Sequence, residues 1–139
     1  MRTASASAEV RTPTRVAIVN VTGTVRQALD DTGMRSGLAV VSVPHTTCAL
    51  TVNEDEAGLR EDLVRLASRL LVPLADQEPF HHDRVDDNAR AHLTAVLIGH
   101  SATLPVVDGD LRLGAWQSLF LLEMDGPRTR RLEMTFLGE

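Results

Sequence analysis

Two Asp-Gly pairs, each next to apolar runs, constrain the fold of this chain most strongly. Asp108-Gly109 follows 'ATLPVV', and Asp125-Gly126 lies between 'SLFLLEM' and 'TRRLEMTFLG'. Such pairs favour tight turns between antiparallel strands, because Gly and Asp tolerate positive φ. The last run alternates polar with apolar residues, Arg131, Glu133 and Thr135 against Leu132, Met134 and Phe136. The last third of the chain is therefore predicted to be antiparallel β-structure with one wet face.

The earlier part of the chain mixes strands with helices. Apolar runs at Val16–Val21, Gly37–Val43 and Cys48–Val52 predict strands. The segment Thr24–Gly33 predicts a short helix that ends at its glycine. Strands and helices in this order, ending in strands, predict an α+β fold with a mainly antiparallel sheet.

Two longer helices are predicted in the middle of the chain. Asn53 is expected to cap the first, with Glu56 at the third helical position. Its core stripe is expected to consist of Leu59, Leu63, Leu66 and Leu70, before Pro73 ends the helix. Asp86 or Asp87 is expected to cap the second helix, which Gly99 ends.

Length and composition fit one domain of 139 residues, 43% of them hydrophobic. Residues 15–139 are predicted to form this domain, and residues 1–14 a flexible lead-in. That segment lacks the apolar stretch of a signal peptide, so a cytoplasmic location is expected. No apolar run approaches the roughly 18 residues of a membrane helix, so no membrane partner is expected. A net charge of −5 and only 3% aromatic residues disfavour nucleic acid as a partner.

The residue types that are missing narrow the chemistry. The chain has no lysine and no tyrosine, which excludes a Schiff-base lysine, a P-loop lysine and a tyrosine acid. Acid–base or metal chemistry must come from histidines, carboxylates or the single cysteine. Cys48 has apolar neighbours, so a small core residue is the favoured interpretation.

The five histidines are the main candidates for chemistry: His45, His81, His82, His92 and His100. His45, His82 and His92 lie at a strand break, in a loop and on a helix, where side chains can converge. Catalytic zinc often has three protein ligands and a water, so these three fit that count. Their spacing matches no short zinc motif, and scattered surface histidines are the alternative.

Other polar residues near these histidines have two interpretations each. Glu54 is a candidate general base or metal ligand, or else an acid at a helix end. Thr46, Thr47 and Ser101 are candidate anion binders, or else ordinary strand residues. Trp116 is expected in the core or an interface. The arginines of 'DGPRTRR' form either an anion clamp, a subunit contact or a solvated turn.

Three motifs in order resemble the YjbQ-like family over about Val16 to Gly138: 'HTTCALTVNE', 'FHHDRVDDNARAHLTAVLIGHS' and 'LPVVDGDLRLGAWQSLFLLEMDGPRTRRLEM'. The resemblance implies a compact α+β fold with a β-sandwich-like core flanked by helices, and a homotrimer. The family's polar positions correspond to His45, Thr46, Thr47, Asn53, Glu54, His82, Asn88, His92, Ser101 and Gln117. Ala115 stands where the family usually has threonine, and Phe80 where it more often has tyrosine or tryptophan.

The family is often described as secondary thiamine-phosphate synthase, which implies a metal-dependent enzyme acting on a small phosphorylated substrate. The expected metal ligands are His45, His82 and His92, with zinc favoured and Mg²⁺ possible with a diphosphate. His45 and Glu54 are the expected catalytic residues. The expected substrate-binding residues are Thr46, Thr47, Asn88, Ser101 and Gln117. The alternative is a non-catalytic trimeric protein that binds a metal or a small anion.

Overall fold

The structure, a computed structural model, describes residues 1–139. Its strands are β1 (Arg2–Arg11), β2 (Ala17–Asn20), β3 (Ser36–Ser42), β4 (Cys48–Glu54), β5 (Ser101–Val107), β6 (Asp110–Leu111), β7 (Gln117–Glu123) and β8 (Thr129–Gly138). Its helices are α1 (Thr22–Thr32), α2 (Ala57–Arg69), α3 (Val72–Gln77) and α4 (Ala89–Ile98), with a 3₁₀ turn η1 (His81–Arg84) before α4.

The strands form two antiparallel sheets. The larger sheet has the order β1-β8-β3-β5-β6, and the smaller has the order β2-β7-β4. The Asp108-Gly109 turn is confirmed, because it joins the antiparallel pair β5 and β6. Asp125-Gly126 joins β7 to β8, but these strands lie in different sheets and do not pair, so the second hairpin prediction is wrong. Asp108 and Gly109 both have positive φ, which their turn requires. The predicted α+β class with a mainly antiparallel core is confirmed.

The main core lies between the two sheets and α1. Apolar side chains from both sheets and from Val25 and Leu29 of α1 form one buried cluster. On β8 the predicted alternation is confirmed, with Leu132, Met134 and Phe136 buried. This burial on one face of the larger sheet fixes the register of its strands.

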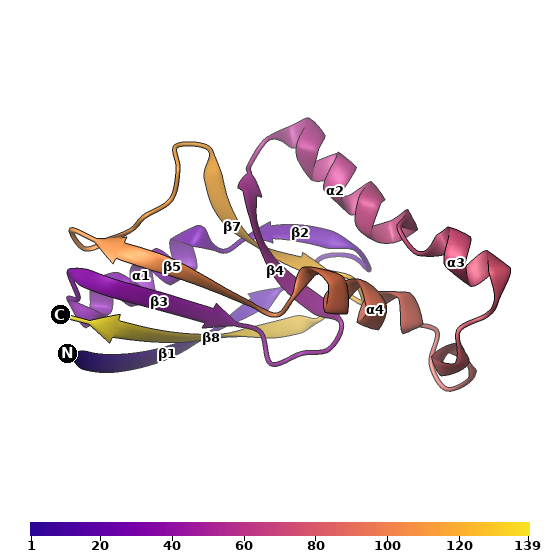
Figure 1. Cartoon of the computed structure of the whole chain (residues 1–139), viewed down its shortest axis with the longest axis horizontal. Helices are drawn as coiled ribbons and strands as arrows, with labels where there is room; N and C mark the ends of the chain where they lie inside the picture. The colour runs from indigo at the N-terminus through magenta and orange to yellow at the C-terminus, as the bar shows by residue number, and fades with distance from the viewer.

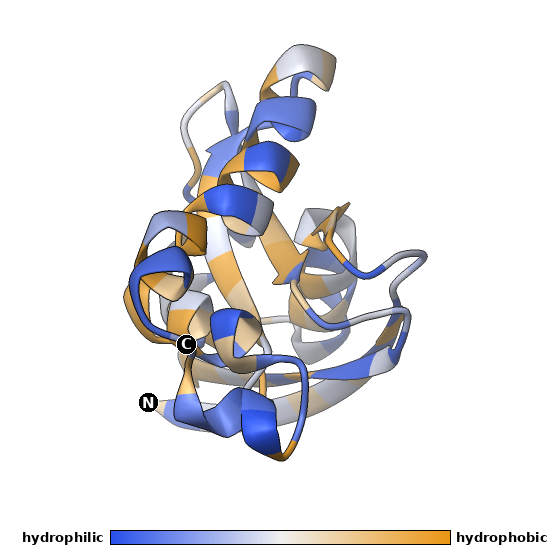
Figure 2. Ribbon diagram, turned by 90° about the vertical axis from the view of Figure 1, so that its right-hand side faces the viewer, coloured by the Kyte–Doolittle hydropathy of each residue, from blue (hydrophilic) through white to orange (hydrophobic).

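The smaller sheet is buried on both faces. Leu119 and Leu121 of β7 face the main core, while Phe120 and Leu122 of the same strand face α2 and α4. Figure 1 shows α2 and α4 on this side of the sheet, and the two chain ends next to each other. In Figure 2 apolar strand segments run behind helices whose turns alternate between polar and apolar colours.

The N-terminal segment is ordered, so the predicted flexible lead-in over residues 1–14 is wrong. Residues Arg2–Arg11 form β1 and pair with β8 along its whole length. Ala4, Ala6, Ala8 and Val10 of this strand face inward, and Val10 is 7% exposed. Small alternating side chains carry a weak apolar signal, which is why the sequence pattern suggested a tail.

The start of α2 also differs from the prediction. Asn53 and Glu54 belong to β4, and Glu56 is the N-cap, accepting bonds from the backbone N–H groups of Gly58 and Leu59. Leu63 packs on the smaller sheet, whereas Leu66 is 55% exposed. Pro73 lies in the first turn of α3, so it starts a helix there. No helix in the structure has the length and apolar character needed to cross a membrane.

Candidate functional site

Most of the polar residues singled out by the sequence lie at one end of the smaller sheet. There β4 begins at Cys48, which is paired with Glu123 at the end of β7. The loop before β4 carries His45 to Thr47, and the turn after β7 carries Asp125 to Arg128. The η1 turn and the first residues of α4 contact this turn through Asn88. We refer to these segments together as the histidine end of the sheet.

A buried ion pair organises the histidine end. Glu123 is fully buried and Arg130 is 5% exposed. Arg130 Nε donates to Glu123 Oε1 at 2.8 Å, and its terminal nitrogen bonds Glu123 Oε2 and Thr47 Oγ1. Thr12 Oγ1 donates to Glu123 Oε1 at 2.7 Å. Burial raises the pKa of Glu123, but the bonds from Arg130 and Thr12 outweigh it and hold the pKa below its usual value.

His45 is fixed by the backbone of β8. The N–H of Arg131 donates to His45 Nε2 at 2.9 Å. Burial and the charges of Arg130 and Arg131 lower the pKa of His45, against an opposing effect of Glu123. His45 is half-buried, Thr46 is exposed, and Thr47 is buried. Of the two threonines, only Thr46 is free to meet a substrate, because the Thr47 hydroxyl bonds Arg130.

His82, Asn88 and His92 form the second part of the histidine end. His82 Nε2 lies 2.9 Å from Asn88 Oδ1. His92 follows Asn88 by one helical turn, and its ring meets the His82 ring edge-on with 4.7 Å between centroids. Asn88 Nδ2 donates to Asp125 Oδ2 at 2.9 Å.

Asp125 is itself held in place. Arg128 donates to the same carboxylate oxygen at 3.0 Å. Burial raises the pKa of Asp125, but the bonds from Asn88 and Arg128 lower it more, and the net shift is downward. The backbone N–H of Asp125 donates to Glu123 Oε2 at 3.2 Å. A continuous series of contacts therefore joins the buried ion pair to His82.

Three predicted site residues lie elsewhere. Glu54 and Gln117 are paired at the opposite end of β4 and β7. Six residue steps of about 3.3 Å separate Glu54 from Cys48, or about 20 Å. The segment after His45 is an extended strand, so it does not fold back to bring Glu54 to His45. Ser101 is the first residue of β5 and pairs with Ser42, three residues before His45.

The histidines of one chain do not form the expected three-ligand zinc site. No three His, Cys, Asp or Glu side chains are grouped so that they could hold a metal ion. The His45 Nε2 lone pair already accepts the Arg131 N–H, so His45 would lose that bond on ligation. Only His82 and His92 are adjacent, and two ligands are fewer than a catalytic zinc usually has.

Cys48 is buried in the main core, as predicted. Burial is the main reason that its pKa is raised to about 11, so the thiol is not a nucleophile at neutral pH. Trp116 is 76% exposed in the single chain, between Gly114 and β7. It is therefore not a core residue of one chain.

Sequence reasoning missed Glu123, Arg130 and Asp125 as site residues. The alternation of β8, which placed Arg131 outside, also places Arg130 inside with Leu132. A buried arginine requires an anionic partner. Glu123, at the end of 'SLFLLE', is the carboxylate on the strand across the Asp-Gly turn. The sequence therefore contained the information needed to predict this pair. Asp125 had no such signal beyond its turn.

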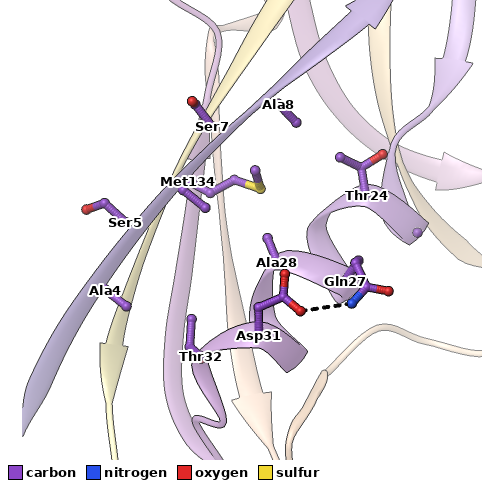
Figure 3. A pocket seen from close by; sticks show the side chains of 12 residues that line it. Ala4, Ser5, Ser7, Ala8, Thr24, Gln27, Ala28, Asp31, Thr32 and Met134 are labelled. Carbon is purple, nitrogen blue, oxygen red and sulfur yellow. Dashed lines mark hydrogen bonds between the residues drawn. The ribbon is translucent and has the colours of Figure 1, made fainter.

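A wide groove lies away from the histidine end. It has a volume of about 750 Å³ and runs between β1 and α1. Figure 3 shows small side chains of β1 on one side of it, and Ala28 and Asp31 of α1 on the other. Gln27 donates to Asp31 at 3.0 Å. This groove contains no histidine, and we do not assign it to the site.

Comparison with known proteins places the chain in a family. The family model described as UPF0047 protein YjbQ-like matches residues 6–139. A UPF0047 protein of Archaeoglobus fulgidus is 46% identical over 88% of this chain and 93% of its own length. The UPF0047 protein YugU of Bacillus subtilis is 31% identical over 94% of this chain and 96% of its own length.

Solved structures agree. A hypothetical protein from Aeropyrum pernix K1 superposes with a TM-score of 0.91 at 45% identity, over 98% of this chain and 99% of its own. A protein of unknown function from Sulfolobus solfataricus P2 gives a TM-score of 0.92 at 34% identity, over 99% of both chains. The resemblance read from three sequence motifs is confirmed, and the chain belongs to the UPF0047 family of YjbQ-like proteins.

Proposed function

We propose that this protein is an enzyme that acts on a small phosphorylated substrate at the histidine end of the sheet. The observation that carries the proposal is the His82–His92 pair, held by Asn88 and Asp125. His82 is exposed and His92 is half-buried, so both rings are accessible beside a rigid helix. An imidazole can both donate and accept a proton, so such a pair suits acid–base chemistry.

The charges around the site favour an anion that is bound mainly by hydrogen bonds. Arg128 and Arg130 are each paired with a carboxylate, and so is Arg131. They supply positive potential but no unpaired guanidinium. The exposed hydroxyl of Thr46 and the imidazole N–H groups remain as donors for phosphate oxygens. This arrangement suits a small phosphorylated molecule better than an extended polyanion such as nucleic acid.

Thiamine-phosphate formation is the named reaction to test. In it the thiazole nitrogen attacks the exocyclic carbon of the pyrimidine diphosphate, the carbon–oxygen bond breaks, and pyrophosphate leaves. A protonated His82 or His92 would donate its proton to the leaving oxygen, and the released imidazole would be reprotonated by solvent. We also propose a divalent metal cofactor, either zinc bound by histidine or Mg²⁺ bound by the diphosphate. Its presence is to be measured. No step above depends on it.

The test compares His82→Gln and His92→Gln with the wild-type protein and with His81→Gln. His81 is adjacent to His82 in the sequence and is exposed. Its Nε2 lies 3.9 Å from Glu78 Oε1 rather than against Asn88, so it serves as the matched control. Thiamine-phosphate and pyrophosphate are measured by chromatography, and bound metal by mass spectrometry. We expect loss of at least about 100-fold in rate for His82→Gln and His92→Gln, with the control unchanged. Equal rates in all four proteins would exclude the proposal.

One observation favours the alternative of a non-catalytic binding protein. Glu54, the expected general base, lies at the far end of β4, and the carboxylates near the histidines are engaged by Arg128 and Arg130. Calorimetric titration with pyrophosphate, with and without zinc, tests this alternative. Binding that is lost in His82→Gln, without any product from the wild type, would support a binding role.

We also propose that the protein assembles into a homotrimer. Several large apolar side chains are exposed in the single chain: Leu66, Leu74, Val85, Val96, Leu97 and Trp116. Burying such side chains is a common reason for assembly. Light scattering coupled to size exclusion should give three times the 15.1 kDa chain mass, and a monomer mass would exclude the trimer.

A further inference from the structure

We propose that Asn88 and Asp125 are positioning residues that fix His82 as the tautomer with its proton on Nε2, so that Nδ1 is its basic atom, while Arg131 fixes the opposite tautomer of His45. The inference builds on the proposed function, because it assigns a role to each imidazole of that site. It follows from the direction of four hydrogen bonds.

The first step is the orientation of the Asn88 amide. Its two ends lie against different partners, Asp125 Oδ2 at 2.9 Å and His82 Nε2 at 2.9 Å. An ionised carboxylate only accepts hydrogen bonds. The bonds from Asn88 and Arg128 hold the pKa of Asp125 below its usual value, so it is ionised at neutral pH. The NH₂ end of Asn88 must therefore face Asp125, which leaves its carbonyl oxygen facing His82.

The second step follows for His82. A carbonyl oxygen only accepts, so the His82 Nε2 beside it must carry a proton. In the neutral ring the lone pair is then on Nδ1. No protein group bonds Nδ1 of His82 in the structure, so this nitrogen is available to accept a proton from a substrate or to bind a cation. The edge-on ring of His92 restricts the rotation of His82 that would exchange the two nitrogens.

The third step concerns His45, where the arrangement is reversed. The backbone N–H of Arg131 can only donate, and it points at Nε2. Nε2 must therefore be unprotonated, and the neutral ring carries its proton on Nδ1. His45 then presents an N–H donor, and His82 presents a lone pair. The two histidines are thus assigned as hydrogen-bond donor and as base, respectively.

This division goes beyond an acid–base pair of equivalent histidines. A substrate phosphate oxygen would be bound by the Nδ1–H of His45, and a proton would move to or from Nδ1 of His82. Asn88 and Asp125 would act only through His82. Asn88 is at the N-cap of α4 but makes no side-chain capping bond, so its replacement by alanine is expected to leave the helix start intact.

The experiment is long-range ¹⁵N–¹H NMR of histidine-labelled protein at pH 8.5, about two units above the ordinary pKa of an imidazole. We expect His82 to show a protonated Nε2 and a bare Nδ1, and His45 to show the reverse. His100, which is exposed and has no hydrogen-bond partner for its ring, is the internal reference for a ring that populates both tautomers. In Asn88→Ala and in Asp125→Ala, the His82 spectrum should approach that of His100, while His45 is unchanged. His82 already resembling His100 in the wild type, or a protonated Nε2 on His45, would overturn the inference.

A kinetic readout separates this inference from the proposed function. If the protein is active, Asn88→Ala should lower kcat by about 10- to 100-fold with little change in KM, because substrate contacts are retained. An unchanged kcat would refute the positioning role. If no activity is found in the wild type, the proposed function fails, but the NMR experiment still decides the tautomers. Should Asn88→Ala not fold, Asp125→Ala gives the same test, because it removes the acceptor that orients the Asn88 amide.

Discussion

Arg130 and Glu123 form a two-point ion pair across the β7–β8 turn, and both side chains are buried. The pair also holds Thr12, which follows β1, and Thr47, which precedes β4. It therefore connects four separate segments of the chain at the histidine end of the sheet. Since the carboxylate accepts from a guanidinium, a hydroxyl and two backbone N–H groups, the buried charge is fully compensated.

The first prediction concerns this ion pair. Glu123→Leu or Arg130→Met should each destabilise the fold by about 3–5 kcal/mol, because either change leaves an uncompensated buried charge. The double variant should lose less than the sum of the two. Urea denaturation followed by circular dichroism measures all three. Additive losses would show that the two charges do not depend on each other.

The exposed pair Arg131–Glu133, on the same strand, is the matched control. Its side chains are 59% and 38% exposed, and surface pairs of this kind contribute at most about 1 kcal/mol. Arg131→Met should therefore change the free energy of unfolding by less than about 1 kcal/mol. It should also leave the His45 contact intact, because that contact uses the backbone N–H.

The second prediction concerns β1. Removing residues 1–11 should destabilise the fold by at least about 3 kcal/mol, because it exposes the paired edge of β8 and removes Val10 from the core. The urea midpoint of the truncated chain measures the loss. A midpoint equal to that of the full chain would contradict this prediction and would support the flexible N-terminal segment that the sequence suggested.

The outcome for β1 shows where sequence reasoning failed. The later strands were readable because their apolar side chains alternate or run continuously, as in 'SLFLLEM'. In β1 alanine and serine alternate, which carries the right period with almost no apolar contrast. The strand forms because β8 supplies a hydrogen-bond partner along its whole length. That pairing depends on the tertiary structure, so local β-propensity does not predict it.

The candidate site was predictable in part for a similar reason. His82, Asn88 and His92 lie within eleven residues of one another, so local helical spacing brings them together. Glu54 and His45 are also close in sequence, but an extended strand of seven residues separates them in space. With the helix cap expected at Asn53, the predicted strand was too short, and Glu54 was expected to be able to reach His45. An error of three residues at one helix start therefore displaced a catalytic assignment by about 20 Å.

The third prediction concerns Gly37, near the start of β3, which pairs with Gly138 at the end of β8. Its φ is +146°, and a Cβ there would lie 1.9 Å from the carbonyl oxygen of Leu137. Gly37→Ala should therefore cost about 2–4 kcal/mol of stability. Gly23→Ala in α1 is the control, since a Cβ there meets nothing within 4 Å. It should stabilise the fold by up to about 1 kcal/mol. Thermal unfolding compares the two, and equal Tm values would contradict the prediction.

The fourth prediction concerns Cys48. Burial raises the pKa of its thiol to about 11, so at pH 8 only about one thiol in a thousand is ionised. The native protein should not react with a thiol reagent within an hour, and should react with one equivalent in concentrated urea. Absorbance of the released chromophore measures both. Rapid labelling of the native protein would place Cys48 at the surface.

The fifth prediction concerns the pH dependence that His45 contributes. Burial lowers the pKa of His45, and Arg130 and Arg131 lower it further, while Glu123 opposes them. Because the folded pKa lies below the unfolded value of 6.5, the unfolded chain binds this proton more readily. The contribution of His45 is therefore fully present above pH 6.5 and is lost as pH falls through its lowered folded pKa.

His45→Gln isolates this contribution, since glutamine can accept the Arg131 N–H but does not titrate in this range. Between pH 8 and pH 5 the Tm of the wild type should fall more steeply than that of His45→Gln. Glu123 remains ionised throughout, because its pKa is lowered from 4.5, and both arginines remain charged. His81→Gln, at an exposed position with no comparable partner, should keep the wild-type slope. A wild-type slope no steeper than that of His45→Gln would mean that protonation of His45 does not oppose folding, and the Arg131 contact would then have no role in holding the ring neutral.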